Sequence, residues 1–154
     1  EVGDEVTIAG LVLEGTLREV YVDEHGEERT RGFSFTGDFV GAWADVLARR
    51  PSRTRVEALV PARVRCFDVK ELRKVEAHAP DLQHALRLVA ERLYVRKSDR
   101  EFELLTMSAG HRYDALLAQV PDVEKLVQLR HIASYLGITP VYLSRLRRRR
   151  RARS

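Results

Sequence analysis

The apolar positions in residues 1–67 form short runs separated by turn residues. Leu11 to Leu13 is one run, and Leu17 to Val22 is a second, which ends at the polar turn Asp23–Gly26. Glycine recurs between the runs and permits backbone conformations that other residues avoid. Short runs with this punctuation are typical of antiparallel strands joined by tight turns. The region therefore predicts a small antiparallel sandwich, roll or barrel.

The clearest strand pattern lies between residues 55 and 66. Apolar side chains occupy one set of alternate positions (the apolar parity) and charged side chains the other set (the charged parity), with Pro61 and Ala62 as an interruption. This alternation predicts one buried face, so we expect Cys66 to pack in the core and to be neither a redox centre nor a metal ligand. The apolar parity holds Val56, Ala58, Val60, Val64 and Cys66, and the charged parity Arg55, Glu57, Arg63 and Arg65.

Helical periodicity begins at Asp68. Residues 68–76 predict a short helix, and Pro80 marks a fresh start, after which no proline or glycine occurs until Gly110. A helix of about 27 residues spans roughly 40 Å, longer than a small domain. We expect its apolar residues to pack on a second copy of the chain, and a core helix within one chain is the alternative. The residues with near-heptad spacing are Leu82, Leu86, Val89 and Leu93.

Two short helices around a glycine close the chain. Residues 108–110 predict a hinge, and residues 111–118 a helix. Leu129 to Leu136 has helical spacing and ends at Gly137. Thr139 can cap the next helix, and Pro140 suits its first position because its missing N–H costs nothing there. The pattern indicates a helix-turn-helix, with an ordinary helical hairpin as the alternative.

The positive charge is concentrated at one end. The chain has a formal net charge of +4, yet residues 145–154 contain seven arginines and no acid. Local basicity of this kind favours a polyanion site over a generally basic surface. The alternative for Arg149 to Arg153 alone is a solvated tail that binds any polyanion.

Composition argues against several classes of protein. No apolar run approaches the ~18 residues of a membrane span. One cysteine cannot form an internal disulfide, which fits the reducing cytoplasm. The five histidines show no metal-ligand or triad spacing, and we expect turn and surface roles for Asp38 and Asp45, so an enzyme is not predicted. The chain opens in what looks like mid-domain, so we expect a fragment or a trimmed protein.

The sequence IASYLGITPVYLSRLR closely resembles the helix-turn-helix of the Crp/Fnr family of bacterial transcription regulators. Residues 10–41 resemble the β-roll of cyclic-nucleotide-binding domains, with Gly15 as the turn glycine and Gly37-Asp38-Phe39 with Gly41 as the family signature. Residues 80–107 look like the dimerisation helix, and residues 112–117 resemble the segment that follows it. By this comparison the chain lacks the first helix and opening strands of the family.

The resemblance implies an α+β fold with three parts. Residues 1–79 would be an incomplete effector-sensing β-roll, residues 80–107 a dimerisation helix, and residues 108–154 a DNA-binding domain. The implied function is binding of a pseudo-palindromic operator as a homodimer in the cytoplasm, with RNA polymerase as a further partner. The alternative is a ligand-sensing module whose helical end contacts another protein.

The resemblance also implies a set of DNA contacts. Ser144 and Arg145 match the recognition-helix pattern, in which Arg145 would contact guanine O6 and N7. Val141 stands where many relatives have glutamate, so it would offer only apolar contact, as with a thymine methyl. The complete set of expected DNA contacts is Thr139, Val141, Tyr142, Ser144, Arg145, Arg147 and Arg148.

The implied effector site departs from the cyclic-AMP pattern. Ala42 and Trp43 follow Gly41 where cyclic-AMP binders have glutamate, and only Arg53-Thr54 can stand for their Arg-Ser pair. We therefore expect a small-molecule effector, if any, that is not a cyclic nucleotide, and one cysteine does not support an iron–sulfur cluster. The candidate effector residues are Gly41, Ala42, Trp43, Arg53, Thr54, Arg96 and Lys97.

Overall fold

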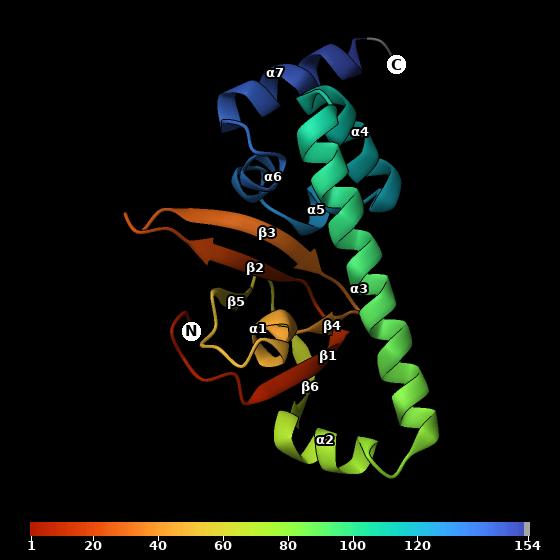
Figure 1. Ribbon diagram of the computed structural model, residues 1–154. Helices are drawn as coiled ribbons and strands as arrows, with labels where there is room; N and C mark the ends of the chain where they lie inside the picture. Colours follow the sequence, from red (N-terminus) through yellow and green to blue (C-terminus); the bar gives the residue numbers. More distant parts are fainter. Residues whose placement is uncertain (153–154) are drawn as a thin grey trace. The chain divides into compact units, whose positions relative to one another are not determined.

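The computed structural model describes residues 1–152 of the chain (Figure 1). The chain forms two compact units, Glu1–Lys97 and a second that begins at Ser98. Each unit has its own buried core. No helix in the described part of the chain is both long and apolar enough to span a membrane.

The first unit contains two three-stranded antiparallel sheets, with strand orders β4-β1-β6 and β3-β2-β5. Val12 and Val40 from one sheet pack with Leu17 from the other, so the core lies between the sheets. The predicted antiparallel fold is confirmed. The strands are β1 (Ile8–Glu14), β2 (Leu17–Val22), β3 (Glu28–Ser34), β4 (Phe39–Val40), β5 (Thr54–Ala58) and β6 (Arg63–Asp68).

The turns between these strands follow local chemistry. At the predicted hairpin, the N–H of Gly26 donates to the carbonyl of Asp23 at 3.0 Å, and Gly26 has a φ of +79°. Gly15 is constrained by space as well, because its φ is +96° and a Cβ there would lie 2.7 Å from the carbonyl oxygen of Pro61. Only glycine fits that turn without displacing backbone.

The predicted burial of the apolar parity in β5 and β6 is wrong for most of its members. Val56, Ala58, Val60 and Cys66 are exposed, and Val64 alone packs against the core. In the described part of the chain, no further layer covers this face at these four residues. Alternation shows which side chains share a face, but it does not show whether another layer covers that face.

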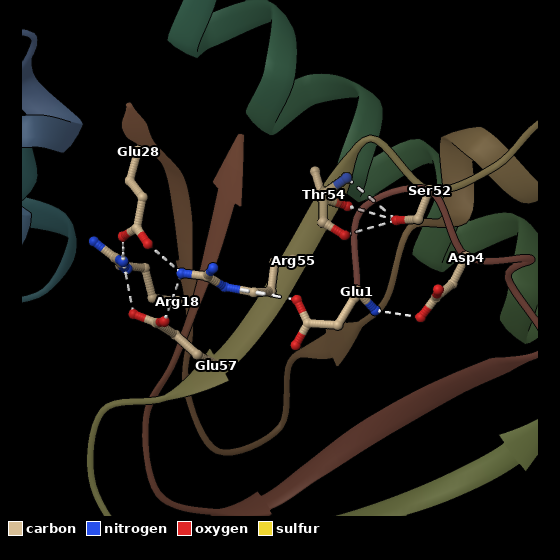
Figure 2. Close-up of polar contacts among 8 residues, drawn as sticks. All are labelled: Glu1, Asp4, Arg18, Glu28, Ser52, Thr54, Arg55 and Glu57. Carbon is tan, nitrogen blue, oxygen red and sulfur yellow. Dashed lines mark hydrogen bonds and ion pairs between the residues drawn. The ribbon is translucent and has the colours of Figure 1, made fainter. Parts of the chain in front are cut away.

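The charged parity of β5 is instead half-buried in a network across the second sheet (Figure 2). Arg18 on β2 donates to Glu57 on β5 at 2.7 Å and also pairs with Glu28 on β3. Arg55 pairs with the same Glu28. Arg18 has a carboxylate partner on each neighbouring strand, and Glu28 is shared by two arginines, so the pairs offset part of the cost of burying these charges.

Three helices complete the first unit. The short helix α1 (Trp43–Leu47) was not predicted, because five residues give no readable periodicity. The helix α2 (Val69–Glu76) begins where the N–H of Glu71 donates to the Asp68 carboxylate at 2.9 Å. The long helix α3 (Pro80–Thr106) matches the predicted 80–107 and continues into the second unit.

The second unit is helical. The long helix ends before Ser108, whose hydroxyl oxygen accepts the N–H of His111, and Ala109 and Gly110 form the first turn of the next helix. A hinge at residues 108–110 stays a prediction. The fully buried core includes Val123, Ile132, Leu136 and Leu143. The helices are α4 (Ala109–Gln119), α5 (Val123–Leu126), α6 (Leu129–Leu136) and α7 (Pro140–Arg151).

Candidate functional site

The turn between α6 and α7 has the geometry that its residues predict. Gly137 adopts the left-handed conformation, with φ 69° and ψ 34°. The N–H of Ile138 then donates to the carbonyl of Ala133 at 3.0 Å, which closes the end of α6. The Thr139 side-chain oxygen accepts the N–H of Tyr142 at 3.2 Å, and Pro140 occupies the first helical turn.

The two helices are fixed to each other by apolar packing. Ile132 and Leu136 on α6 and Leu143 on α7 are all 0% exposed. This core holds one face of α7 against the unit. The geometry is that of a helix-turn-helix, in which the opposite face of the second helix is available to a partner.

The exposed face of α7 carries most of the residues expected to contact DNA. Val141, Tyr142, Ser144, Arg145 and Arg148 are exposed, as is Thr139 at the cap. A hydroxyl, an aromatic ring and two guanidinium groups therefore lie together on one face. These groups can donate to phosphate oxygens and to base edges.

Arg147 does not lie with this set. Its side chain is 23% exposed, and its Nε donates to Oε1 of Glu124 on α5 at 2.7 Å. Arg150 likewise pairs with Asp114 on α4. Two arginines of the basic run therefore point toward neighbouring helices. Arg153, also in that run, lies outside the described residues.

Glu124 has a second partner in Tyr113 of α4, whose hydroxyl donates to the same carboxylate oxygen. Burial alone would raise the pKa of Glu124, but the hydrogen bonds from Tyr113 and Arg147 outweigh burial, and the pKa is lowered. Burial and the contact with Glu124 raise the pKa of Tyr113 to about 12. The carboxylate and the phenol therefore keep their charge states across the neutral range.

Sequence patterns missed two arginines that close the end of α6. Arg112 donates to the carbonyls of Met107 at 2.6 Å and Leu136 at 2.9 Å. Arg100 donates to the carbonyl of Tyr135 and stacks 4.0 Å from the centroid of its ring. Cations at a helix C-terminus satisfy its unpaired carbonyls and its dipole. The contacts with Tyr135 and Leu136 join residues 35 and 24 positions apart, so no local signal marks them.

The first unit has a cavity of about 180 Å³ between α1, α3 and the strands. Three of the expected effector residues, Gly41, Trp43 and Lys97, line it. The indole of Trp43 forms one wall, edge to face with Phe39 at 5.8 Å between centroids. Burial, followed by the charge of Arg31, lowers the pKa of Lys97.

The remaining expected effector residues do not line the cavity. Ala42 is buried beside it, and Thr54 is buried with its carbonyl accepting the hydroxyl of Ser52 at 2.7 Å. Arg96 donates to the carbonyl of Phe33 at 3.2 Å. Arg53 is bound to Asp45, so these four side chains have structural partners or positions within the first unit.

Asp45 is a buried residue of α1 that binds the loop after this helix. It is 3% exposed, so the expected surface role is wrong. Its carboxylate accepts the Nε of Arg50 at 2.7 Å and both the N–H and the Nε of Arg53 at 3.0 Å. Burial alone would raise its pKa, but these donors lower it from 3.8 to about 2.

The apolar residues of α3 lie on two different faces. The four residues with near-heptad spacing are half-buried, and Leu93 among them lines the cavity. Three others, seven residues apart and therefore on one face, are exposed: Leu88 at 48%, Val95 at 54% and Phe102 at 58%. We call Leu88, Val95 and Phe102 the outer row of α3. Dimerisation through Leu82, Leu86, Val89 and Leu93 stays a prediction.

No three histidine, cysteine or carboxylate side chains within residues 1–152 are grouped so as to hold a metal ion. No family model matches the chain. It is 30% identical to the anaerobic regulatory protein of Aggregatibacter actinomycetemcomitans over 158 residues, which cover 94% of this chain. The match spans only 60% of the length of that relative.

Solved structures share the fold across the whole chain. FixK2 from Bradyrhizobium japonicum superposes with a TM-score of 0.82 at 21% identity, covering 99% of this chain and 79% of that one. A CRP-family transcriptional regulator from Thermus thermophilus superposes with a TM-score of 0.76 at 19% identity, covering 99% and 79%. The chain is therefore similar in sequence and in fold to the Crp/Fnr family of bacterial transcription regulators, as its helix-turn-helix and β-roll motifs predict.

Proposed function

We propose that the chain is part of a transcription regulator that binds a specific DNA sequence through α7. The observation that carries the proposal is the exposed face of α7, where Ser144, Arg145 and Arg148 stand beside Val141 opposite a fully buried Leu143. A helix held by one face and bearing arginines on the other suits the major groove. The relatives named above are regulators, which supports the same conclusion.

Each exposed residue has a distinct proposed contact. Arg145 donates two hydrogen bonds to guanine O6 and N7, and Val141 packs against a thymine methyl. Thr139, Tyr142, Ser144 and Arg148 contact phosphates and fix the register of the helix. The half-site therefore carries a guanine and does not require the cytosine that a glutamate at position 141 would contact.

We propose that the regulator is a homodimer that pairs through α3. The outer row of α3 is an uncovered apolar face at heptad spacing, which suits a two-stranded coiled coil. Two recognition helices would then enter successive major grooves roughly 34 Å apart. The operator would be a pseudo-palindrome whose symmetry matches that of the dimer.

The proposed division of the chain is a sensing part at residues 1–79, a dimerisation helix at 80–107 and a DNA-binding part at 108–154. The cavity beside Trp43 is the proposed effector site. Its volume of about 180 Å³ is small, below the roughly 300 Å³ at which drug-sized ligand sites begin. Ala42 stands at the glutamate position, and Arg53 is held by Asp45. These features favour an effector smaller than a cyclic nucleotide, with Lys97 as a cationic contact.

The salt dependence of DNA binding tests this function against the alternative in which the helical end binds a protein. Binding of duplex DNA is measured by fluorescence anisotropy between 50 and 200 mM salt. For a protein that makes roughly 6–10 phosphate contacts, this rise in salt lowers the affinity by ~10³–10⁵. A steep negative slope is expected. Absence of binding at low salt, or a flat slope, would favour a protein partner.

A further inference from the structure

We propose that four arginines of α7 form two sets with different roles, and that Arg147 positions the recognition helix and makes no contact with DNA. The proposal rests on the proposed function, because it assigns roles within the same DNA-binding helix. Arg147 stands immediately before Arg148 in a run of arginines, and the sequence does not show which of them has a carboxylate partner.

The contact between Arg147 and Glu124 is bidentate. The Nε of Arg147 donates to Oε1 at 2.7 Å, and Nη2 donates to Oε2 at 3.2 Å. The two side chains are 23% and 27% exposed. Two parallel hydrogen bonds between planar groups fix orientation as well as distance, which a single-point lysine contact would not do.

The Glu124 carboxylate is itself held in place. Tyr113 is 3% exposed, and its hydroxyl donates to the same Oε1 that accepts from Arg147. One carboxylate on α5 therefore ties together Tyr113 of α4 and Arg147 of α7. Three helices meet at this group, which we call the Glu124 junction.

A second ion pair lies one turn further along α7. Arg150 pairs with Asp114 on α4. Leu143, Arg147 and Arg150 are spaced i, i+4 and i+7, so they lie on the same face of the helix. This docking face consists of the fully buried Leu143, the partly buried Arg147 and, at its exposed end, Arg150, whose pair with Asp114 has side chains 49% and 56% exposed.

The exposed face repeats the same spacing two residues earlier. Val141, Arg145 and Arg148 are also at i, i+4 and i+7, and all three are exposed. A guanidinium neutralised by a neighbouring carboxylate displaces few counterions from DNA, whereas an exposed one displaces about one. The two faces therefore predict different salt dependences for substitutions at neighbouring positions.

The test compares Arg147→Gln with the matched control Arg148→Gln in the full chain. Each is titrated against the operator recovered by selection and against a random-sequence duplex, over a range of salt. Arg148→Gln should reduce the slope of log affinity against log salt by about one. It should leave the ratio of the affinity for the operator to the affinity for random DNA unchanged. Arg147→Gln should leave the slope unchanged and lower the ratio by about tenfold, within the range for coupled residues.

Glu124→Gln separates positioning from charge. It removes an acid near the site, so a purely electrostatic role of Arg147 predicts tighter binding to all DNA. The proposal predicts instead the loss of operator preference seen with Arg147→Gln. Two results would overturn the proposal. One is an Arg147→Gln variant whose salt slope falls by about one while its ratio of operator affinity to random-DNA affinity is unchanged. The other is a Glu124→Gln variant that binds all DNA more tightly with the same selectivity.

Two further readouts separate failure of this proposal from failure of the proposed function. A wild-type chain that does not distinguish the operator from random DNA contradicts the function itself. Thermal unfolding of Arg147→Gln, Glu124→Gln and the double variant then tests the docking contact alone. The changes in stability of the two single variants should not add up to that of the double variant, and strictly additive changes would contradict the Glu124 junction.

Discussion

Asp45 accepts hydrogen bonds from both the backbone N–H and the guanidinium Nε of Arg53, each at 3.0 Å. Arg53 is the residue that resemblance to cyclic-AMP binders would assign to a phosphate. Its carboxylate partner is almost fully buried and also binds Arg50. The loop between α1 and β5 is therefore held together by an internal ion-pair cluster, which lowers the availability of Arg53 for a ligand.

Replacing Asp45 with asparagine should destabilise the chain in a pH-dependent manner. The folded pKa of about 2 lies below the ordinary value of 3.8, so folding favours the carboxylate and the stabilisation is present above pH ~4, about 2 kcal/mol. It should be lost as the pH falls from about 4 to 2.

Urea unfolding of the wild type and Asp45→Asn at several pH values measures this difference. The exposed Asp4→Asn is the control and should change stability little. A wild-type advantage over Asp45→Asn that stays constant down to pH 2 would contradict the assignment.

Replacing Arg145 with alanine should cost ~1–3 kcal/mol of binding to the operator and relax the preference for guanine at one position. The reason is the loss of the two hydrogen bonds proposed for its guanidinium. Competition binding against operators with each base at that position measures the effect. Arg29→Ala, an exposed arginine on β3, should leave affinity and preference as they are; an unchanged base preference in Arg145→Ala would remove its assigned role.

Replacing Leu143 with alanine should destabilise the second unit by ~2–5 kcal/mol, because Leu143 is fully buried and the change leaves a cavity. Denaturant unfolding followed by circular dichroism measures this. Leu47→Ala, at a leucine that is 58% exposed, should cost much less. Equal costs at both positions would mean that the packing of α6 on α7 is not as described.

Replacing Val95 and Phe102 with glutamate should weaken the proposed dimer. Both belong to the outer row of α3, and a charge in a coiled-coil core is strongly unfavourable. Analytical ultracentrifugation at micromolar concentration should show monomers for the variant and dimers for the wild type. Val56→Glu, at an exposed valine on β5 and away from α3, serves as the control. A variant that remains dimeric would move the interface to another surface.

The elements that the sequence predicts well are those set by neighbouring residues. Gly137, Thr139 and Pro140 define the helix-turn-helix because a left-handed glycine, a side-chain cap and a first-turn proline each act within a few residues. The hairpin at Asp23–Gly26 is predictable for the same reason.

The elements that the sequence does not predict depend on contacts between distant residues. Arg147 and Glu124 are 23 positions apart, so a run of arginines conceals which of them are paired. Cys66 is exposed because no layer in the described part of the chain covers that side of β6 at this residue, and periodicity does not encode this. Asp45 is buried and paired with Arg50 and Arg53 in the following loop, and neither fact has a periodic signal in the sequence.

Selection from a pool of random duplex DNA, at near-physiological salt, tests the central claim most directly. The account predicts recovery of a pseudo-palindrome with half-site centres about one helical turn apart, each half-site containing a guanine for Arg145. The same selection, repeated with small-molecule effectors added, tests whether DNA binding requires a ligand. Recovery of no shared sequence under any of these conditions would contradict sequence-specific DNA binding by α7.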